Sequence, residues 1–273
     1  MYRTNIVCGV GCLKKGNIKQ TTYRIVLSTF LLLFLCTFIS FGADSSFVTL
    51  ISTNDIWKYN DDGVDLGTEW RGLTYDDSHW LSGNAEFGYG EGDEATTNKW
   101  GPDADNKYPT YYYRKTINIT NLVRITNFIC NFLRDDGIVV YVNGTLAFFN
   151  NFPDGTTQIS YPTYANVVGG TEETQWFTTN ISKSLFVEGQ NVIAVEIHQC
   201  DATSSDISFN LALIAEIGPN LLPTITLVQP TNNSFYYVPT NITITGNASD
   251  SDGGVAMVEF FSGSQKIGES TNS

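Results

Sequence analysis

The sequence predicts an all-β protein, a β-sandwich or jelly roll, from its strand lengths, its turn spacing and its lack of helical periodicity. Short runs of β-branched and aromatic residues alternate with clusters of Gly, Asn, Asp and Pro. Apart from an N-terminal apolar run, no stretch longer than about two turns carries the 3.6-residue apolar period of a helix. Many short strands at this spacing are typical of sandwiches and jelly rolls.

The clearest stretch is residues 134–144, which is expected to form a turn, a strand and a second turn. Asp135-Asp136-Gly137 favours a corner, because Asp and Gly tolerate left-handed backbone conformations. The run from Ile138 to Val142 is β-branched or aromatic throughout, and Asn143-Gly144 is a strong signal for a tight hairpin. Since neither face of this strand is polar, we expect it near the middle of a sandwich.

The remaining strands of this unit are expected from the same kind of pattern. They are residues 47–51, 56–59, 111–119, 128–133, 145–149, 192–199 and 207–215. Residues 70–80 are expected to form a loop or one helical turn, with Asp76-Asp77-Ser78 as a capping cluster. Residues 87–108 are expected to form a long loop, of the kind that is usually functional or mobile.

The pattern changes after residues 218–223, which contain Gly and Pro and are expected to be a linker. Residues 224–228, 241–245 and 255–261 alternate between apolar and polar side chains. Three or four strands fit before Ser273, whereas an Ig-like sandwich needs about seven. Residues 224–273 are therefore predicted to be a truncated Ig-like β-sandwich that frays or aggregates in isolation.

Residues 1–43 are predicted to be a secretory signal peptide. Residues 25–39 form an apolar run, Lys19 and Arg24 precede it, and Ser40, Gly42 and Ala43 supply small residues for cleavage. The run is short for a membrane span, which needs about 20 residues, and an uncleaved anchor is the alternative. The prediction places the protein outside the cell or on its surface, with membrane contact limited to transit of the signal peptide.

Cleavage would leave two cysteines, Cys130 and Cys200. In an oxidising compartment they could form a disulfide. The alternative is a pair of small buried side chains with free thiols.

The part of the chain after residue 43 is strongly acidic. The whole chain has a formal net charge of −13, and residues 44–273 hold 10 basic and 28 acidic residues, a net charge of −18. Such a surface repels nucleic acid and anionic lipid, so neither is an expected partner. Aromatic residues make up 13% of the chain, which suits half-buried strand positions or a sugar-binding surface.

Short motifs in a set order and spacing cover about residues 50–216. They are Trp57-Lys58-Tyr59, Asp76-Asp77-Ser78-His79-Trp80, Phe87-Gly88-Tyr89-Gly90, Tyr112-Tyr113-Arg114-Lys115, Arg134-Asp135-Asp136-Gly137, Tyr141-Val142-Asn143-Gly144, Phe152-Pro153-Asp154-Gly155, residues 189–199 and Ser205-Asp206-Ile207-Ser208-Phe209. With these motifs the segment resembles the galactose-binding-like jelly-roll modules of secreted bacterial multidomain proteins. The resemblance implies a jelly-roll β-sandwich over residues 44–217.

The tail resembles the first half of a bacterial Ig-like repeat. The matching residues are Pro223-Thr224-Ile225-Thr226-Leu227, Pro230, residues 248–255 and Val258-Glu259-Phe260-Phe261. Such repeats are spacers and adhesive stalks in cell-surface and polymer-degrading proteins.

Several loops carry carboxylates, the oxygen ligands that Ca²⁺ takes. These are Asp61, Asp62, Asp65, Asp76 and Asp77, with Asp93 and Glu94 further along. Their spacing is not that of an EF-hand loop. Jelly rolls of the resembled class often hold one structural Ca²⁺, so we expect at most one such ion and no other cofactor.

Loop aromatics are the candidate stacking platforms for sugar rings. Trp100, Tyr89 and Trp176 are the main candidates and Trp70 is another, with Trp100 the most exposed because its loop is polar. Trp57 and Trp80 are expected in the core.

Two polar pairs are weaker candidates for ligand binding. Asp135 and Asp136 could form a turn or bind a metal or a sugar hydroxyl at the rim. Glu196 and His198 share one face of a strand, and if buried they need a partner such as Arg134 or Arg114.

The resemblance implies a secreted, non-catalytic binding module of a larger protein, with a glycan or cell-surface polysaccharide as ligand and downstream domains as partners. A structural spacer or docking domain beside a catalytic domain is the alternative. A hydrolase is a third reading. The residues favour it least, because His79 and His198 are the only histidines and no nucleophile signature is present.

Overall fold

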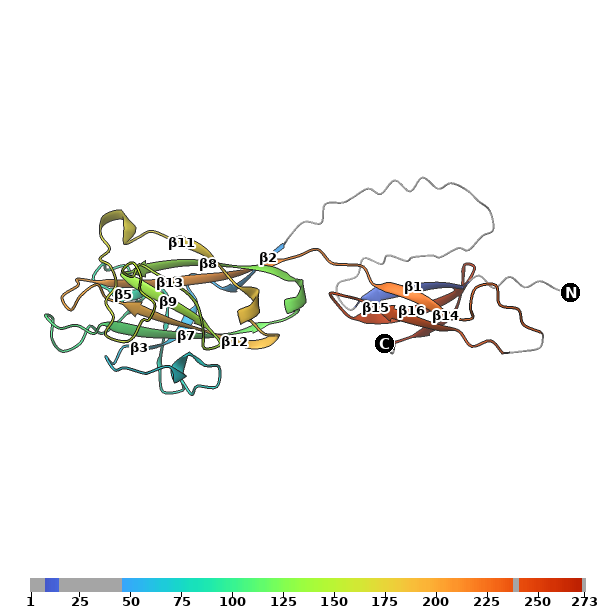
Figure 1. The fold of residues 1–273 in the computed structure, drawn as a ribbon, viewed down its shortest axis with the longest axis horizontal. Coiled ribbons are helices and arrows are strands. Elements are labelled where there is room, and N and C mark those ends of the chain that lie inside the picture. Colours follow the sequence, from blue (N-terminus) through green and yellow to red (C-terminus); the bar gives the residue numbers. More distant parts are fainter. Residues whose placement is uncertain (1–7, 15–45, 238–240, 272–273) are drawn as a thin grey trace. The chain divides into compact units, whose positions relative to one another are not determined.

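The computed structural model describes residues 8–14, 46–237 and 241–271, and β-strands dominate these segments. The described residues fall into two compact units, one within Asp44–Gly218 and one containing β1 and β14–β17 (Figure 1). The only helices there are short 3₁₀ turns: η1 (Glu69–Arg71), η2 (Leu122–Arg124), η3 (Gly170–Glu172) and η4 (Lys183–Leu185). Within these residues, no helix has the length and apolar character that crossing a bilayer requires.

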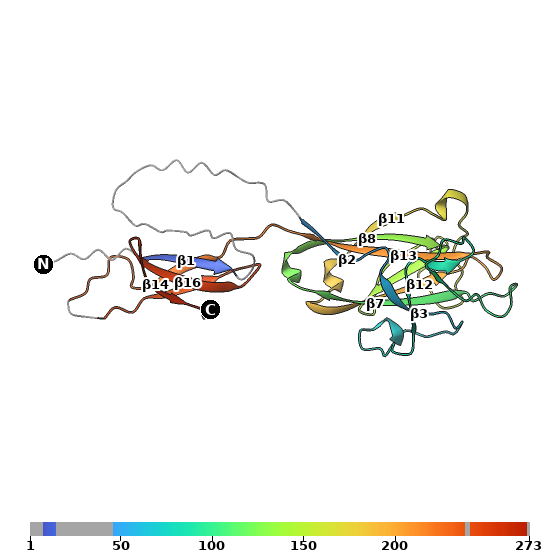
Figure 2. The same ribbon diagram turned by 180° about the vertical axis from the view of Figure 1, so that it is seen from behind.

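The unit within Asp44–Gly218 is a sandwich of two six-stranded sheets. The first sheet has the order β10 (Thr145–Asn150), β9 (Gly137–Val142), β12 (Gly189–His198), β7 (Thr110–Ile119), β3 (Ile56–Asn60) and β4 (Leu81–Asn84). The second has the order β11 (Phe177–Ile181), β8 (Ile125–Asp135), β13 (Ile207–Ile217), β5 (Phe87–Tyr89) and β6 (Thr96–Thr97), with β2 (Ser46–Ile51) also paired to β13. The two layers are visible from both sides in Figures 1 and 2. The predicted all-β fold class is confirmed.

The main core lies between the two sheets. Strand alternation sends every second side chain inward, as with Tyr111 and Tyr113 on β7. Their partners from the second sheet include Phe209, whose ring centroid lies 4.4 Å from that of Tyr113 and 5.2 Å from that of Trp57. The expected core position of Trp57 is confirmed, since its side chain is buried at the centre of this cluster.

A second apolar cluster covers the outer face of the first sheet. It contains Trp70, Trp80, Tyr112, Val139, Tyr141, Phe152, Ala165 and Ala194. Loops supply Trp70, Trp80, Phe152 and Ala165, and the strands supply the rest. The run from Ile138 to Val142 is therefore buried on both faces, although β9 lies beside the edge strand β10 rather than at the centre of its sheet.

The turns around β9 follow the sequence pattern. The chain crosses from the second sheet to the first at Asp136, between β8 and β9. Asn143 and Gly144 have φ values of 51° and 85°, which are the left-handed values that a two-residue hairpin turn requires. The predicted hairpin between β9 and β10 is confirmed.

Other local expectations need correction. Residues 87–89 are strand β5 rather than the start of a loop. For residues 70–80, where a loop or one helical turn was expected, the 3₁₀ turn η1 ends at Arg71 and the rest is a loop, in which Asp76 Oδ1 accepts the Ser78 N–H at 3.0 Å instead of capping a helix. Strand β11 was not expected from its polar surroundings.

In the other unit, β14 (Thr224–Gln229) pairs with β15 (Thr245–Ser249), and β16 (Val255–Ser262) pairs with β17 (Gln265–Ser270). β15 begins four residues later than expected, since its ladder stops opposite Gln229 and the following Pro230 has no N–H to extend it. Strand β1 (Cys8–Lys14) pairs with β16 and falls inside the expected signal peptide. The apolar run 25–39 lies outside the described residues.

Gly90 offers a test of the close approach between the end of β5 and the start of β13. A Cβ on Gly90, whose φ is +111°, would lie 2.6 Å from Asp206 Cβ, whereas a Cβ on Gly92, whose φ is +85°, has no neighbour within 4 Å. Both alanine variants strain the backbone, but only Gly90→Ala also overpacks. We expect Gly90→Ala to lower the free energy of unfolding by roughly 1–3 kcal/mol more than Gly92→Ala in urea titrations. Equal losses would contradict the close approach.

Candidate functional site

An open groove lies on the outer face of the second sheet and encloses about 440 Å³. It is lined by Thr49, Ser52, Thr53, Asn131, Trp176, Ala212 and Ile214. These residues come from β2 and the turn after it, from β8 and β13, and from the residue before β11. On β8 and β13 they alternate with the core residues, so the groove lies on the face turned away from the core.

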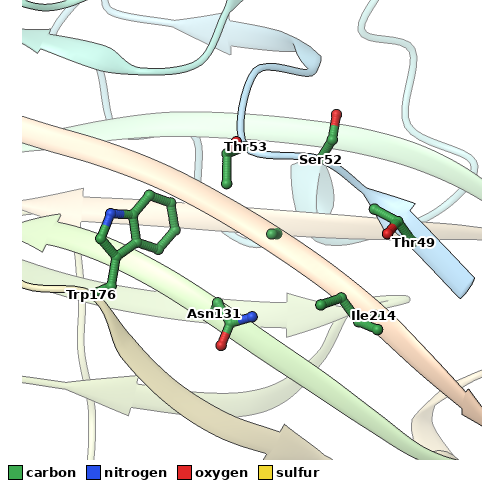
Figure 3. Close-up of a pocket in the computed structure, with 7 residues that line it drawn as sticks. Thr49, Ser52, Thr53, Asn131, Trp176 and Ile214 are labelled. Carbon is green, nitrogen blue, oxygen red and sulfur yellow. The ribbon is translucent and has the colours of Figure 1, made fainter. Parts of the chain in front are cut away.

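Trp176 forms one wall of this groove, and small polar side chains lie opposite and beside it (Figure 3). Trp176 is 41% exposed, so much of its large apolar ring system is open to solvent. Asn131 accepts a hydrogen bond from the Thr178 hydroxyl at 2.7 Å through Oδ1, and its Nδ2 has no partner among the described residues. The groove thus combines one aromatic face with hydroxyl and amide groups.

The other predicted stacking residues do not line the groove. Trp100 is 45% exposed, as expected, and packs against Tyr89 with ring centroids 5.6 Å apart. Tyr89 and Trp70 are buried, so the prediction that they are exposed platforms is wrong. Tyr89 packs beneath Trp100 and against Tyr111, and Trp70 fills the outer apolar cluster of the first sheet.

A cluster of carboxylates lies where the loop after β5, the end of β8 and the start of β13 meet. Oxygens of Glu91, Asp135 and Asp206 all lie within 4.8 Å of one another, and the same is true of Glu86, Glu91 and Asp93. The sequence prediction named Asp135 but missed Glu86, Glu91 and Asp206. The sequence feature that could have indicated Glu91 and Asp206 is the run Gly88-Tyr89-Gly90-Glu91. Gly90 has no side chain, and this allows the chain next to Glu91 to lie close to Asp206.

The carboxylates of this cluster repel one another in a partly desolvated setting. Burial, followed by the charges of Asp136 and Asp206, raises the pKa of Asp135 to about 9. Burial raises the pKa of Glu86, and Asp93 and Glu91 add to that shift. Burial also raises the pKa of Glu91 against the opposing effect of its hydrogen bond from Ser208.

Asp136 has a structural role that its neighbour lacks. Its Oδ1 accepts the Val168 N–H at 2.9 Å and its Oδ2 accepts the Cys200 N–H at 2.6 Å. The carboxylate thereby ties two loops to the point where the chain changes sheets. Asp135 is equally buried, but its Oδ1 has no hydrogen-bond partner.

The five aspartates predicted to bind a metal do not come together in such a group. Asp61 and Asp62 pair with Lys99 Nζ at 3.3 and 3.0 Å. Asp65 and Asp76 each accept a backbone N–H two residues further along, from Gly67 and Ser78. Asp77 pairs with Arg114 Nε at 2.7 Å. Turn and ion-pair contacts engage oxygens of all five carboxylates, so their arrangement gives no support to a shared metal site, and their role as ligands stays a prediction.

Glu196 and His198 lie in a buried polar network under the loops that cover the first sheet. Arg71 Nη2 donates to Glu196 Oε1 at 2.9 Å, and the Tyr141 hydroxyl donates to Oε2 at 3.3 Å. His198 Nδ1 lies 2.8 Å from the Thr163 carbonyl oxygen, to which it donates. His198 Nε2 lies 3.4 Å from Glu196 Oε2.

The cation that meets Glu196 differs from the two expected ones. Arg71 is the partner, and its guanidinium also stacks 4.1 Å from the ring centroid of Tyr141. Arg114 pairs with Asp77, and Arg134 pairs with Glu172 at 2.5 Å. The loop carrying Arg71 folds over the outer face of the first sheet, a contact that strand periodicity does not reveal.

Cys130 and Cys200 are free thiols in this structure. Cys130 lies in the core on β8, and burial raises its pKa well above the usual range. Burial raises the pKa of Cys200 to about 11, with a further increase from Asp136.

The family model described as "Bacterial Ig domain" matches residues 223–273. This confirms the expected resemblance of the tail. No curated protein matches the chain in sequence.

Among solved structures, the chain is similar to a β-glucuronidase from glycoside hydrolase family 2, with 13% identity over 84% of this chain and 26% of that chain and a TM-score of 0.41. It is also similar to a Bacteroides uniformis β-glucuronidase, with 16% identity over 68% of this chain and 20% of that chain and a TM-score of 0.39. A glycosyl hydrolase family 2 member from Bacteroides cellulosilyticus is similar with 14% identity over 67% of this chain and 23% of that chain, and the TM-score is 0.40. The chain thus spans about a quarter or less of each enzyme, and TM-scores of this size do not establish a shared fold. The expected likeness of residues 44–217 to galactose-binding-like modules stays a prediction.

Removing Arg71 tests the buried network. Arg71→Met leaves the Glu196 charge buried without its cation, and we expect the free energy of unfolding to fall by about 3–5 kcal/mol. Lys115→Met is the control, because Lys115 pairs with Asp55, both side chains are partly exposed, and such an ion pair should contribute about 0–1 kcal/mol. Adding Glu196→Gln to Arg71→Met should recover part of the loss. Equal effects of the two single substitutions in urea titrations would contradict the network.

The two thiols should react slowly in the folded protein. With its pKa near 11, Cys200 holds roughly two hundredfold less thiolate at about pH 8 than a free cysteine. We expect iodoacetamide to modify Cys200 slowly and Cys130 only after unfolding, as measured by peptide mapping against a cysteine peptide. Rapid modification of Cys130 in the native chain, or a Cys130–Cys200 disulfide without reductant, would contradict this.

Proposed function

We propose that residues 44–217 form a non-catalytic carbohydrate-binding module of a protein that acts outside the cell or on its surface. The observation that carries the proposal is Trp176 in the groove of the second sheet. A sugar ring presents an apolar face of C–H groups and a rim of hydroxyls. The groove has complementary features, namely a half-exposed indole and the side chains of Thr49, Ser52, Thr53 and Asn131.

The groove favours a neutral glycan. None of its lining residues is charged. The chain as a whole has a net charge of −13, which repels anionic polymers at long range. The openness of the groove suits an extended chain that passes across the sheet, rather than a small ligand that must be enclosed on most sides.

Support for a non-catalytic role comes from the position of the best acid–base pair. Glu196 and His198 are both buried. The Glu196 carboxylate accepts a hydrogen bond from Arg71, and His198 Nδ1 donates to the Thr163 carbonyl oxygen, so both groups are engaged within the protein. A glycosidase needs two carboxyl groups flanking the bond to be cleaved, in a cleft that admits the substrate. The proposed extracellular location is supported by the apolar run 25–39 after basic residues.

Trp176→Ala should abolish or strongly weaken glycan binding. Loss of an indole that stacks on the sugar should lower the affinity for the glycan at least tenfold, which corresponds to about 1.4 kcal/mol of binding free energy. Trp100→Ala is the matched control, since Trp100 is exposed to a similar extent but lies outside the groove. The measurement is a screen of neutral polysaccharides, followed by calorimetry on the best binder.

Two results would argue against the groove. If the folded wild-type chain binds no glycan in the screen, the spacer or docking role is favoured. If Trp100→Ala loses binding and Trp176→Ala retains it, sugar recognition lies in the loops around Tyr89 instead.

A further inference from the structure

We propose that Glu91, Asp135 and Asp206 bind a divalent cation of the Ca²⁺ type and that this ion joins three separate segments of the second sheet. The site goes beyond glycan binding, because none of its residues lines the groove. It also differs from the aspartates that the sequence singled out, apart from Asp135.

The first argument is charge. Glu91, Asp135 and Asp206 place carboxylate oxygens within 4.8 Å of one another, and Glu86 and Asp93 extend the cluster around Glu91. No lysine or arginine in the described part of the chain forms an ion pair with any of these five carboxylates. Elsewhere in the same unit, two buried carboxylates do have cations, since Arg71 pairs with Glu196 and Lys99 pairs with Asp61.

The second argument is an unmet demand for partners. Asp135 is only 2% exposed and its Oδ1 has no hydrogen bond. Asn210 lies outside both carboxylate groups and is also buried. Its amide hydrogen-bonds to Glu86, while its Oδ1 has no partner. Buried oxygens without donors are costly, and a cation satisfies several of them at once.

The third argument concerns the choice of ion. The available ligand atoms are all oxygens, with no histidine or cysteine in either group. Such a set suits Ca²⁺ or Mg²⁺ and disfavours Zn²⁺, which takes nitrogen and sulfur. Ca²⁺ accepts irregular, crowded oxygen sets more readily than Mg²⁺, which demands a regular octahedron. Glu91 is exposed, so the site opens to solvent on one side and leaves room for water ligands.

The three ligands come from different parts of the chain. Glu91 lies in the loop after β5, Asp135 is the last residue of β8, and Asp206 directly precedes β13. A bound ion therefore links the loop 90–95 to the two strands that carry the groove. Ser208 and Ser205 donate hydrogen bonds to Glu91 and Asp206 and orient these carboxylates for the ion.

The experiment compares the whole chain in Ca²⁺ and in chelator, by thermal denaturation, calorimetry and Tb³⁺ luminescence excited through tyrosine. We expect Ca²⁺ to raise the Tm of the wild type, because the ion binds the folded state alone. Glu91→Gln should weaken Ca²⁺ binding at least tenfold. Asp65→Asn is the matched control and should leave binding unchanged, since Asp65 bonds within its own turn.

Asp135→Asn adds a second readout. The substitution removes a charge from the cluster, so the variant should be at least as stable as the wild type in chelator and should not respond to Ca²⁺. Should this buried variant fail to fold, Glu91→Gln and Asp206→Asn, at more accessible positions, decide the matter. A wild type whose Tm is the same in Ca²⁺ and chelator, or an undiminished Ca²⁺ response in Glu91→Gln, would overturn the proposal.

Discussion

A buried carboxylate must meet a hydrogen-bond donor or a cation, and the loops of the larger unit are held in place by this requirement. Asp136 takes backbone N–H groups from Val168 and Cys200. Glu196 takes the guanidinium of Arg71, 125 residues away in the sequence. Each of these contacts fastens a loop to the sandwich, and each would leave a costly unpaired charge if the loop moved away.

The two sheets differ because loops cover only one of them in this way. Trp70, Trp80, Phe152 and Ala165 cover the outer face of the first sheet, so Glu196 and His198 are enclosed beneath them. The outer face of the second sheet keeps an open groove with Trp176 at its wall. The surface available to a ligand is thus set by which face the loops leave bare.

Strands and turns were largely predictable because their signals are local. The alternation in β7 and β12, the run Ile138–Val142 and the Asn143-Gly144 turn all formed the expected structures. The site was less predictable. Trp176 and Trp100 look alike in sequence, yet only Trp176 lines the groove. Tyr89, in a Gly-rich run typical of a loop, is a buried strand residue because Gly90 lets that strand lie against β13.

The sequence by itself determined the all-β class, most of the strands and the Ig-like character of the tail, because each depends on side-chain period and turn chemistry within a short window. Only the tertiary structure decided which acidic residues gather. Asp61, Asp62, Asp65, Asp76 and Asp77 are close in sequence but do not gather in one group, whereas Glu91, Asp135 and Asp206 are far apart in sequence and meet. The reason is that strand order and register, set by pairing between distant segments, fix the distances between loop side chains.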